Sequence, residues 1–338
     1  MKDVAARAGV SLGTVSNVLN HPDQVSERTR DKVHAAIEAL GFVRNESARR
    51  LRGGRSRTLA YVVFSTTNPF FTDVADGAQA AADASGLALY LCNSGGDAQR
   101  QNTYLDLLER QRTEGVLITP VDPADPRIAA MAGRGTPVVV VARGTVDTPG
   151  VCSVSCDDVA GGDLAATHLI DAGHRHVAFV GPARDLGRPT DRLLGAERAV
   201  ARSGGDLTLL EVDGYSIADG RRAGERLAGI PAARRPSGVF CGNDLVALGL
   251  LQQVVRLGLR VPDDVAIVGY DDIAFAEAAT VPLTTVAQPR HRLGRTAVDL
   301  LLAHGPDGGI PERRHVVFEP QLVVRASTRM HQYLPRTS

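Results

Sequence analysis

The sequence lacks any long hydrophobic run. No stretch of about 18 consecutive apolar residues occurs among its 338 residues, so no transmembrane helix is expected. The N-terminus also lacks the apolar segment of a secretory signal, because Met1-Lys2-Asp3 leads directly into an amphipathic stretch. We therefore expect a protein that acts in the cytoplasm and does not bind a membrane.

Cysteine is scarce. The chain contains four, and no histidine lies at zinc-ligand spacing from the one close pair, Cys152 and Cys156. A chain of this length can bury a large core without a disulfide or metal to hold it together. We interpret the cysteines as small buried apolar residues and predict no metal site; they are Cys92, Cys152, Cys156 and Cys241.

The common signatures of enzymes and cofactor sites are missing as well. The chain has no G-x-G-x-x-G, no phosphate-binding G-x-x-x-x-G-K-[ST] and no H-E-x-x-H. Residues 9–13 (GVSLG) match the nucleophile-elbow pattern G-x-S-x-G, but no strand precedes them, as that motif requires. The sequence therefore predicts a protein that is not an enzyme and holds no cofactor.

The chain also has no net charge, with 38 basic and 38 acidic residues, but these residues are unevenly distributed. Residues 1–57 contain eleven Lys or Arg and six Asp or Glu, so this segment is positive by five charges and the remainder is negative by five. A basic head on an acidic body is the asymmetry expected when one end of a protein binds nucleic acid.

Three short helical patterns occupy the basic head. Gly9 is expected to end the first helix, Ser11 to cap the second, and Ser26 to cap the third. The apolar face of the third helix is expected to comprise Val33, Ala36, Ile37 and Leu40. Two short helices joined by a glycine turn suit a helix-turn-helix, although a small protein-binding module would have the same pattern.

From residue 58 onward, short apolar runs alternate with helical stretches. Continuous apolar strands with a helix between each pair indicate parallel sheets covered on both faces, so the predicted fold class is α/β. Two passages, 115–119 and 238–242, resemble each other and suggest two comparable halves. The expected strands are 59–64, 87–92, 116–119, 138–142, 177–180, 239–241 and 265–268.

Several motifs together resemble one family. Residues 2–20 (KDVAARAGVSLGTVSNVLN) are similar to the DNA-binding headpiece of the LacI/GalR family of bacterial transcription regulators, and 25–33 (VSERTRDKV) to its third helix. Core motifs of the family follow in order: NPFF at 68–71, AGHR at 172–175, ND at 243–244 and VGYDD at 268–272. The resemblance covers nearly the whole chain.

The resemblance implies three parts. These are a three-helix headpiece over 1–43, a hinge helix and linker over 44–57, and an effector-binding core over 58–338. The core is expected to be two-lobed and similar to periplasmic binding proteins. Its N-lobe would comprise about 58–156 and 287–318, and its C-lobe about 157–286 and 319–331.

The headpiece and hinge are expected to bind DNA. The second helix would enter the major groove, and in this family the hinge folds on DNA and inserts a leucine into the minor groove, here Leu51. A basic linker with an incidental leucine would have the same composition. The predicted DNA-binding residues are Ser11, Leu12, Gly13, Thr14, Ser16, Asn17, Asn20, Ser26, Asn45, Arg49, Leu51 and Arg52.

Ligands of two-lobed α/β proteins bind between the lobes, at the carboxyl ends of strands. By resemblance, the predicted effector-binding residues are Phe70, Phe71, Asp157, Arg192, Tyr215, Asn243 and Asp271. Other interpretations stay open: Phe70 and Phe71 can be core or dimer contacts, and Asp271 a helix cap. Asp244 and Asp272 are better explained as helix N-caps. Asn243 and Asp271 favour a sugar over a nucleobase, because amide and carboxylate groups bind paired hydroxyls.

The sequence therefore predicts a ligand-responsive transcriptional repressor. It would bind a palindromic operator as a homodimer and respond to a small metabolite, with a sugar favoured. The first alternative is a solute-binding protein with the same core, which would require a signal peptide and no basic head. The second is an α/β enzyme, which would require a nucleophile–base constellation or a cofactor loop.

Overall fold

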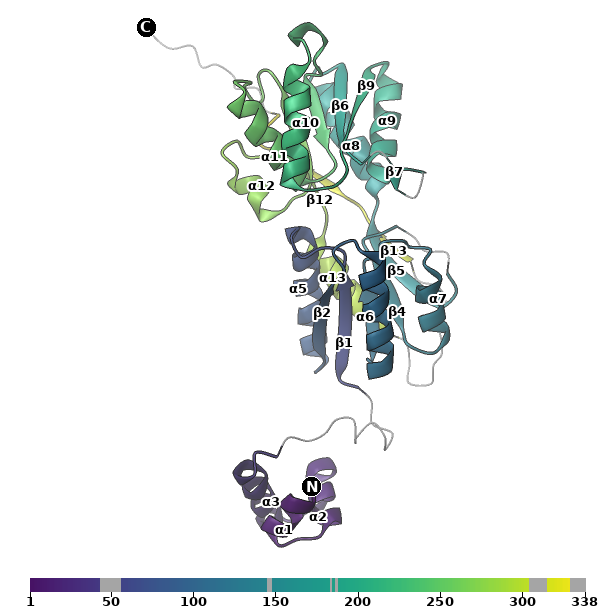
Figure 1. The fold of residues 1–338 in the computed structure, drawn as a ribbon, viewed down its shortest axis with the longest axis vertical. Coiled ribbons are helices and arrows are strands. Elements are labelled where there is room, and N and C mark those ends of the chain that lie inside the picture. Colours follow the sequence, from purple (N-terminus) through teal and green to yellow (C-terminus); the bar gives the residue numbers. More distant parts are fainter. Residues whose placement is uncertain (43–55, 145–147, 183, 186–187, 304–314, 329–338) are drawn as a thin grey trace, which may run out of the picture. The chain divides into compact units, whose positions relative to one another are not determined.

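The computed structural model describes residues 1–42, 56–144, 148–182, 184–185, 188–303 and 315–328. The chain forms two compact units, Met1–Ser56 and Arg57–Ser338 (Figure 1), and each is described by itself. The predicted hinge residues Asn45, Arg49, Leu51 and Arg52 lie outside the described residues.

The first unit is a small helical module. Helices α1 (Lys2–Ala8), α2 (Leu12–Asn20) and α3 (Glu27–Ala39), with the short 3₁₀ helix η1 (Pro22–Gln24), enclose one apolar cluster. Its buried members come from all three helices: Val4, Ala5, Val15, Val18, Val33 and Ala36. Val15 and Val18 occupy one side of α2 at the helical spacing, so the opposite side of that helix is left for solvent.

The expected helix ends are mostly confirmed. Gly9 ends α1 with a φ of 66°, and the Ser11 hydroxyl accepts a hydrogen bond from the Thr14 backbone N–H at the start of α2. Ser26 precedes α3, but its hydroxyl contacts the Thr29 hydroxyl and caps no backbone N–H. Leu40 was predicted to face inward and is exposed, because it lies just past the last turn of α3.

The second unit contains two six-stranded sheets, one in each lobe. The N-lobe sheet has the order β13-β5-β4-β3-β1-β2, and all its strand pairs are parallel. Its strands are β1 (Thr58–Val63), β2 (Ala88–Asn93), β3 (Gly115–Ile118), β4 (Val138–Val141), β5 (Val151–Cys156) and β13 (His315–Phe318).

The C-lobe sheet has the order β14-β12-β11-β10-β6-β9, and β14 alone runs antiparallel to its neighbour. Its strands are β6 (His176–Gly181), β9 (Asp206–Glu211), β10 (Gly238–Cys241), β11 (Ala266–Asp271), β12 (Thr284–Ala287) and β14 (Gln321–Val323). The short strands β7 (Arg184–Asp185) and β8 (Arg188–Pro189) pair only with each other. Along its described part, the chain crosses between the two lobes three times, after β5, β12 and β13.

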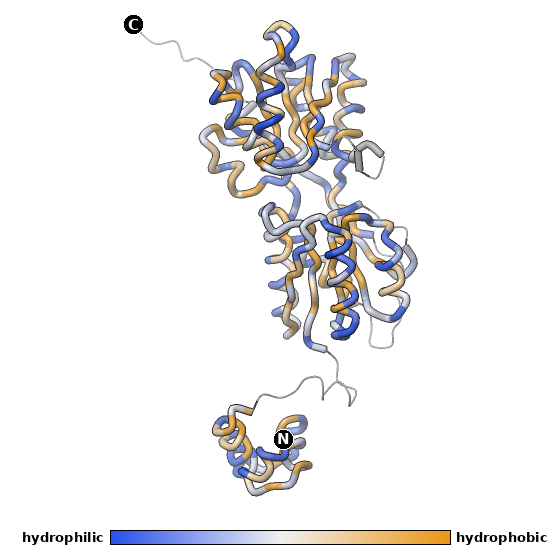
Figure 2. Tube along the Cα trace, in the orientation of Figure 1, coloured by the Kyte–Doolittle hydropathy of each residue, from blue (hydrophilic) through white to orange (hydrophobic). Residues whose placement is uncertain are grey.

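Helices cover both sheets, and Figure 2 shows hydrophilic residues along the outer helices and hydrophobic ones along the strands. The N-lobe helices are α5 (Pro69–Ala84), α6 (Ala98–Gln111), α7 (Pro126–Gly133) and α13 (Arg290–Leu302). The C-lobe helices are α8 (Asp158–Asp171), α9 (Asp191–Ser203), α10 (Ile217–Gly229), α11 (Asp244–Arg256), α12 (Ala274–Ala278) and the 3₁₀ helix η2 (Ala232–Arg234). The predicted α/β fold class is confirmed.

Three helix pairs pack through glycines: α5 with α13, α8 with α9, and α10 with α11. A Cβ atom on Gly294 of α13 would lie 1.9 Å from the Val74 carbonyl oxygen, and one on Gly77 of α5 would lie 2.1 Å from the His291 carbonyl oxygen. The backbones therefore touch directly, and no side chain larger than hydrogen fits between them.

The strand expected over residues 87–92 is present as β2, but it is less buried than predicted. The apolar run 87–92 predicted a strand covered on both faces, but β2 lies at the sheet edge and is largely exposed. Tyr90 is 48% exposed and Leu91 is 46% exposed. Consecutive strand residues point to opposite faces, so neither face of this edge is fully covered within the chain.

We predict that Gly294→Ala destabilises the core by about 1–3 kcal/mol or more, because its methyl group would push α13 away from α5. Chemical denaturation of the full chain measures the loss. Gly133→Ala is the control, since Gly133 ends α7 with open space around its Cβ position. That change should leave stability unaltered or raise it by up to about 1 kcal/mol. Equal effects of the two substitutions would contradict the close-packing argument.

Candidate effector cleft and DNA-binding surface

The second helix of the small unit presents a polar surface. Leu12 is 44% exposed, and Ser11, Gly13, Asn17 and Asn20 are also exposed on and before α2. Thr14 and Ser16 are partly buried, and Ser26 is exposed before α3. The exposed residues of α2 lie on the side away from the core, because Val15 and Val18 hold the other side of α2 in the core.

Local hydrogen bonds order part of this surface. The Ser11 and Thr14 hydroxyls lie 2.9 Å apart, and Asn20 Nδ2 donates to the Ser16 carbonyl and hydroxyl oxygens. Within the described residues, the Asn17 side chain makes no hydrogen bond. Short polar side chains on an exposed helix can contact phosphates and base edges in a major groove.

The candidate effector cleft is centred on Arg192, the second residue of α9. Its Nη1 donates to the Gly242 carbonyl oxygen at 2.6 Å, and its Nε donates to Asp158 Oδ1 at 3.3 Å. Its Nη2 lies 3.7 Å from Asp271 Oδ1, which is too far for a hydrogen bond. The side chain is 17% exposed, so this cation is largely removed from water.

Asp271 ends β11 with a positive φ of 105° and is 2% exposed. Its Oδ1 accepts a hydrogen bond from Gln288 Nε2 at 2.9 Å, and its Oδ2 accepts one from Asn68 Nδ2 at 3.3 Å. Asn68 precedes α5 in the N-lobe, so this last hydrogen bond crosses between the lobes. Asp271 caps no helix.

Asn243 and Tyr215 lie beside the same carbonyl that Arg192 contacts. A Cβ atom on Gly242 would lie 2.8 Å from Tyr215 Cε1, and Asn243 Nδ2 donates to the Tyr215 carbonyl oxygen at 3.2 Å. Asn243 Oδ1 also caps α11 by accepting from the Val246 N–H. Tyr215 is partly buried, and Asn243 is 2% exposed. The structure thus brings Arg192, Tyr215, Asn243 and Asp271 together.

The remaining predicted effector residues lie differently. Phe70 is buried in an apolar cluster that also contains Leu245 and Ile273 of the C-lobe, and Phe71 packs on that cluster with its ring centroid 5.1 Å from that of Phe70. Asp157 is exposed and caps α8 through its carboxylate. Phe70 and Phe71 match the core interpretation that the sequence left open, whereas the capping role of Asp157 was not predicted.

The predicted N-cap roles of Asp244 and Asp272 are wrong. Asn243 is the N-cap of α11, while the fully buried Asp244 accepts hydrogen bonds from the Thr285 hydroxyl at 2.6 Å and the Ile273 N–H at 2.9 Å. Asp272 pairs with Arg325 at 2.8 Å. The buried carboxyl group of Asp244 needs these donors, since a buried polar group without hydrogen bonds would be costly.

Burial and charge shift the acid–base properties of the cleft. Burial lowers the pKa of the Arg192 guanidinium, but the carboxylates of Asp158 and Asp271 more than offset this and raise it above its ordinary value. Burial raises the pKa of Asp271 to about 6, although Arg192 opposes the shift. Burial, with the charge of Asp271, raises the pKa of Asp244 to about 8. At neutral pH, Arg192 and Asp271 are therefore predominantly charged.

The sequence interpretation missed four contributors to the cleft. Asn68 lies within the NPFF motif, and Gln288 follows β12 at the same sheet edge as Asp271. Asp158 and Tyr270 contact Arg192 from two other elements. Their neighbours in sequence were identified, but the contacts depend on how α8, α9 and β11 pack.

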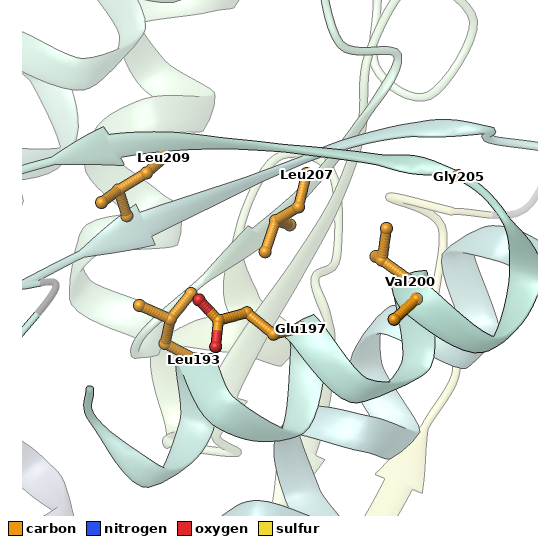
Figure 3. Close-up of a pocket in the computed structure, with 7 residues that line it drawn as sticks. Leu193, Glu197, Val200, Gly205, Leu207 and Leu209 are labelled. Atoms are coloured by element: carbon orange, nitrogen blue, oxygen red, sulfur yellow. The ribbon is translucent and has the colours of Figure 1, made fainter. Parts of the chain in front are cut away.

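A separate hollow of about 310 Å³ lies at the outer edge of the C-lobe, between α9 and the edge strand β9 (Figure 3). Apart from Glu197, its lining is apolar or glycine: Leu193, Val200, Ala201, Gly205, Leu207 and Leu209. It contains none of the predicted effector residues. The described residues contain no cluster of His, Cys, Asp and Glu suited to a metal ion. Their helices are all too short or too polar to span a bilayer.

The architecture defines a class of protein, in which a small helix-turn-helix unit is joined to a two-lobed α/β unit with buried polar side chains at the carboxyl ends of its strands. Comparison with known proteins agrees. Residues 1–45 match the model of the bacterial regulatory proteins of the lacI family, and 166–328 match the periplasmic binding protein-like domain.

Similar proteins match over nearly the full length. The chain is 34% identical over 332 residues to an HTH-type transcriptional repressor PurR of Aliivibrio fischeri, covering 97% of each chain. A complex of the transcriptional regulator CelR with cellobiose is 32% identical, with a TM-score of 0.70, covering 96% of this chain and 98% of that one. A lac repressor dimer bound to operator and the anti-inducer ONPF is 27% identical, with a TM-score of 0.81 and coverages of 97% and 98%. The chain belongs to the lacI family of bacterial regulatory proteins.

The raised pKa of Asp244 predicts a pH-dependent stability. The folded protein retains on this carboxyl a proton that the unfolded chain releases, so the free energy of unfolding should fall as pH rises towards 8. The contribution of Asp244 to this slope should be about 1.4 kcal/mol per pH unit near pH 6.5 and about half of that at pH 8, where the carboxyl of the folded protein is half ionised. Burial lowers the pKa of His168 and His174, and these groups act in the opposite direction until the histidines of the unfolded chain have lost their protons, about one pH unit above their ordinary pKa of 6.5.

Denaturation at several pH values tests this, and Asp244→Asn should flatten the slope. Asp264→Asn is the matched control, because hydrogen bonds from Arg260 lower the pKa of Asp264 to about 2 and it is ionised in both states throughout. If Asp244→Asn leaves the dependence of the free energy of unfolding on pH unchanged, a group other than Asp244 causes that dependence.

Proposed function

We propose that the protein is a ligand-responsive transcriptional repressor that binds a palindromic operator as a homodimer and responds to a small sugar. One observation carries the proposal: a helical unit with an exposed polar helix is joined to a core whose lobes meet at a cluster of buried polar side chains. A repressor must reach chromosomal DNA, so we place its action in the cytoplasm.

Operator binding is supported by the exposed side of α2. Major-groove recognition uses short polar side chains on a helix that a second helix braces, and here α1 and α3 hold Val15 and Val18 in place. We propose that the DNA contacts come from Ser11, Leu12, Gly13, Thr14, Ser16, Asn17, Asn20 and Ser26, and from the hinge residues Asn45, Arg49, Leu51 and Arg52.

A homodimer is supported by the exposed edge strand β2. Tyr90 on one face and Leu91 on the other leave apolar surface exposed at this strand edge, and proteins normally cover such edges. The lac repressor structure that this chain is similar to is a dimer on operator. A twofold dimer matches a palindromic site, with half-sites about one helical turn apart.

A sugar effector is supported by the groups in the cleft. Arg192 donates, Asp271 accepts, and Asn243 and Tyr215 lie beside them. Hydroxyl groups can donate and accept at once, so they can bind both members of such a pair. The similar CelR structure holds cellobiose. A solute-binding protein with the same core is disfavoured, since it would have no use for the helical unit.

Binding of the effector would change how the lobes meet at the Asn68–Asp271 hydrogen bond. A ligand can shift such an equilibrium only by binding one arrangement of the lobes better than the other. We propose that this difference orders or disorders the hinge and thereby changes operator affinity, which couples the two sites.

For the operator, we predict that Leu51→Ala weakens specific binding by about 1–3 kcal/mol and reduces DNA bending, because the apolar wedge is lost. Non-specific, salt-dependent binding should persist. Footprinting and circular-permutation gel shifts measure both effects. Leu40→Ala, at an exposed leucine past the end of α3, is the control. If Leu51→Ala changed neither operator affinity nor DNA bending, the hinge proposal would be contradicted. A footprint on one unrepeated half-site would contradict the dimer proposal.

For the effector, we predict that Arg192→Ala or Asp271→Ala weakens sugar binding at least tenfold, because each leaves a buried charge unpaired. Operator binding without effector should survive. Arg202→Ala is the control, since Arg202 lies on the same helix in an exposed pair with Asp163. Calorimetry with the sugar found by a thermal-shift screen measures affinity. Two variants that bind as tightly as wild type would move the site towards Phe70, Phe71, Tyr215, Asn243 and Asp157.

A further inference from the structure

The guanidinium of Arg192 is held by two side chains that the sequence analysis did not select as effector residues, Tyr270 and Asp158. Its carbon lies 3.8 Å from the centroid of the Tyr270 ring, so the two planes are in contact. The Tyr270 hydroxyl donates to Asp158 Oδ1 at 2.7 Å, and the same oxygen accepts from Arg192 Nε. Asp158, Tyr270 and Arg192 therefore form a closed triangle of contacts.

Two glycines of helix α8 leave the space that Tyr270 and Arg192 occupy next to Asp158. A Cβ atom on Gly161 would lie 2.2 Å from the Tyr270 hydroxyl oxygen, and one on Gly162 would lie 2.0 Å from the Arg192 carbonyl oxygen. Both glycines belong to the first turns of α8, which begins at Asp158. The helix that supplies the carboxylate thus also leaves room for its two partners.

Asp158 and the Gly242 carbonyl bind two of the three guanidinium nitrogens of Arg192, and the third, Nη2, is left for a ligand. Nε is bound by Asp158 and Nη1 by the Gly242 carbonyl, whereas Nη2 faces Asp271 Oδ1 across 3.7 Å. A hydroxyl oxygen placed against both atoms can accept from Nη2 while its own hydrogen is donated to the carboxylate.

The charge of Arg192 is already balanced on two sides. A phosphate or carboxylate ligand that approached the guanidinium would also approach the negative side chains of Asp158 and Asp271. If the ligand displaced one of these side chains from Arg192, that carboxylate would lose its cationic partner.

We propose that Asp158 and Tyr270 are positioning residues that hold Arg192 in this one orientation and keep it neutralised, so that the cleft accepts an uncharged polyhydroxylated effector and rejects an anionic one. The specificity rests on the proposed effector cleft. The positioning by Asp158 and Tyr270 does not require that any ligand be identified, so it can be tested first.

Tyrosine fluorescence tests the positioning. The chain has six tyrosines and no tryptophan, so tyrosine emission is observed directly. A carboxylate that accepts the phenol hydrogen bond quenches tyrosine emission, so Asp158→Asn should increase it. In a Tyr270→Phe background, Asp158→Asn should cause no further increase. Asp163→Asn is the control, because it removes an exposed carboxylate of the same helix that pairs with Arg202 of α9.

An increase that depends on Tyr270 supports the triangle, whereas no increase, or the same increase in the Tyr270→Phe background, overturns it. A variant that merely loosened the fold would alter emission in both backgrounds. Circular dichroism and unfolding temperature identify such loosening, and Gly161→Ala then serves as the second variant. Its methyl group displaces the Tyr270 hydroxyl with Asp158 intact, so it should increase emission as well.

Matched sugars test the specificity. D-ribose, D-glucose and cellobiose are compared by calorimetry with ribose 5-phosphate, glucose 6-phosphate and cellobiose 6′-phosphate, respectively. We expect the uncharged sugar that binds wild type to bind at least tenfold more tightly than its phosphate ester. Asp158→Asn should lower the ratio of the affinity for the sugar to the affinity for its phosphate ester at least fivefold, and Asp163→Asn should leave this ratio unchanged.

A phosphate ester that binds wild type better, or a difference that Asp158→Asn leaves intact, overturns the specificity. If no uncharged sugar binds, the sugar effector and the specificity fail together, while the fluorescence result still decides the positioning. Operator gel shifts with wild type judge the repressor function independently of both.

Discussion

The buried guanidinium of Arg192 is the constraint on which the candidate effector cleft depends. A cation with 17% of its side chain exposed needs opposite charge and hydrogen-bond acceptors around it, and the chain supplies them from three elements: α8, β11 and the loop before α11. Those elements can supply partners only if both glycines of α8 let Tyr270 and the backbone of α9 approach. Packing and electrostatics are therefore inseparable at this site.

The same residues connect the lobes. Asp271 receives hydrogen bonds from the N-lobe through Asn68 and from the crossover segment after β12 through Gln288. Phe70 shares an apolar cluster with Leu245 and Ile273, which follow Asp244 and Asp272 in the chain. A molecule that binds at Arg192 and Asp271 thus acts on groups that already join the two lobes, which is the physical basis for coupling effector binding to the lobe arrangement.

Where the sequence prediction failed, the reasons are local. Strand β5 was not predicted because serine alternates with valine and cysteine along it, although its hydroxyls are buried, as with Ser153 bonded to His315. The edge strand β9 alternates polar and apolar residues, so it lacked the expected continuous run. Conversely, β2 has such a run and is exposed, because hydropathy does not distinguish a central strand from an apolar edge. Asp244 was misassigned because Asn243 one residue earlier supplies the cap.

The sequence by itself determined the division into a basic helical head and an α/β core, the turn between α1 and α2, and most central strands. These features depend on periodicity, glycines and caps within a few residues, which are local properties of the chain. Only the tertiary structure decided that Asp158 and Tyr270 hold Arg192, that Asn68 reaches Asp271, and that Phe70 is core. Asp158 and Tyr270 lie 34 and 78 positions from Arg192 in the sequence, and Asn68 lies 203 positions from Asp271. Helix packing decides which of these residues come into contact, and no local sequence pattern encodes it.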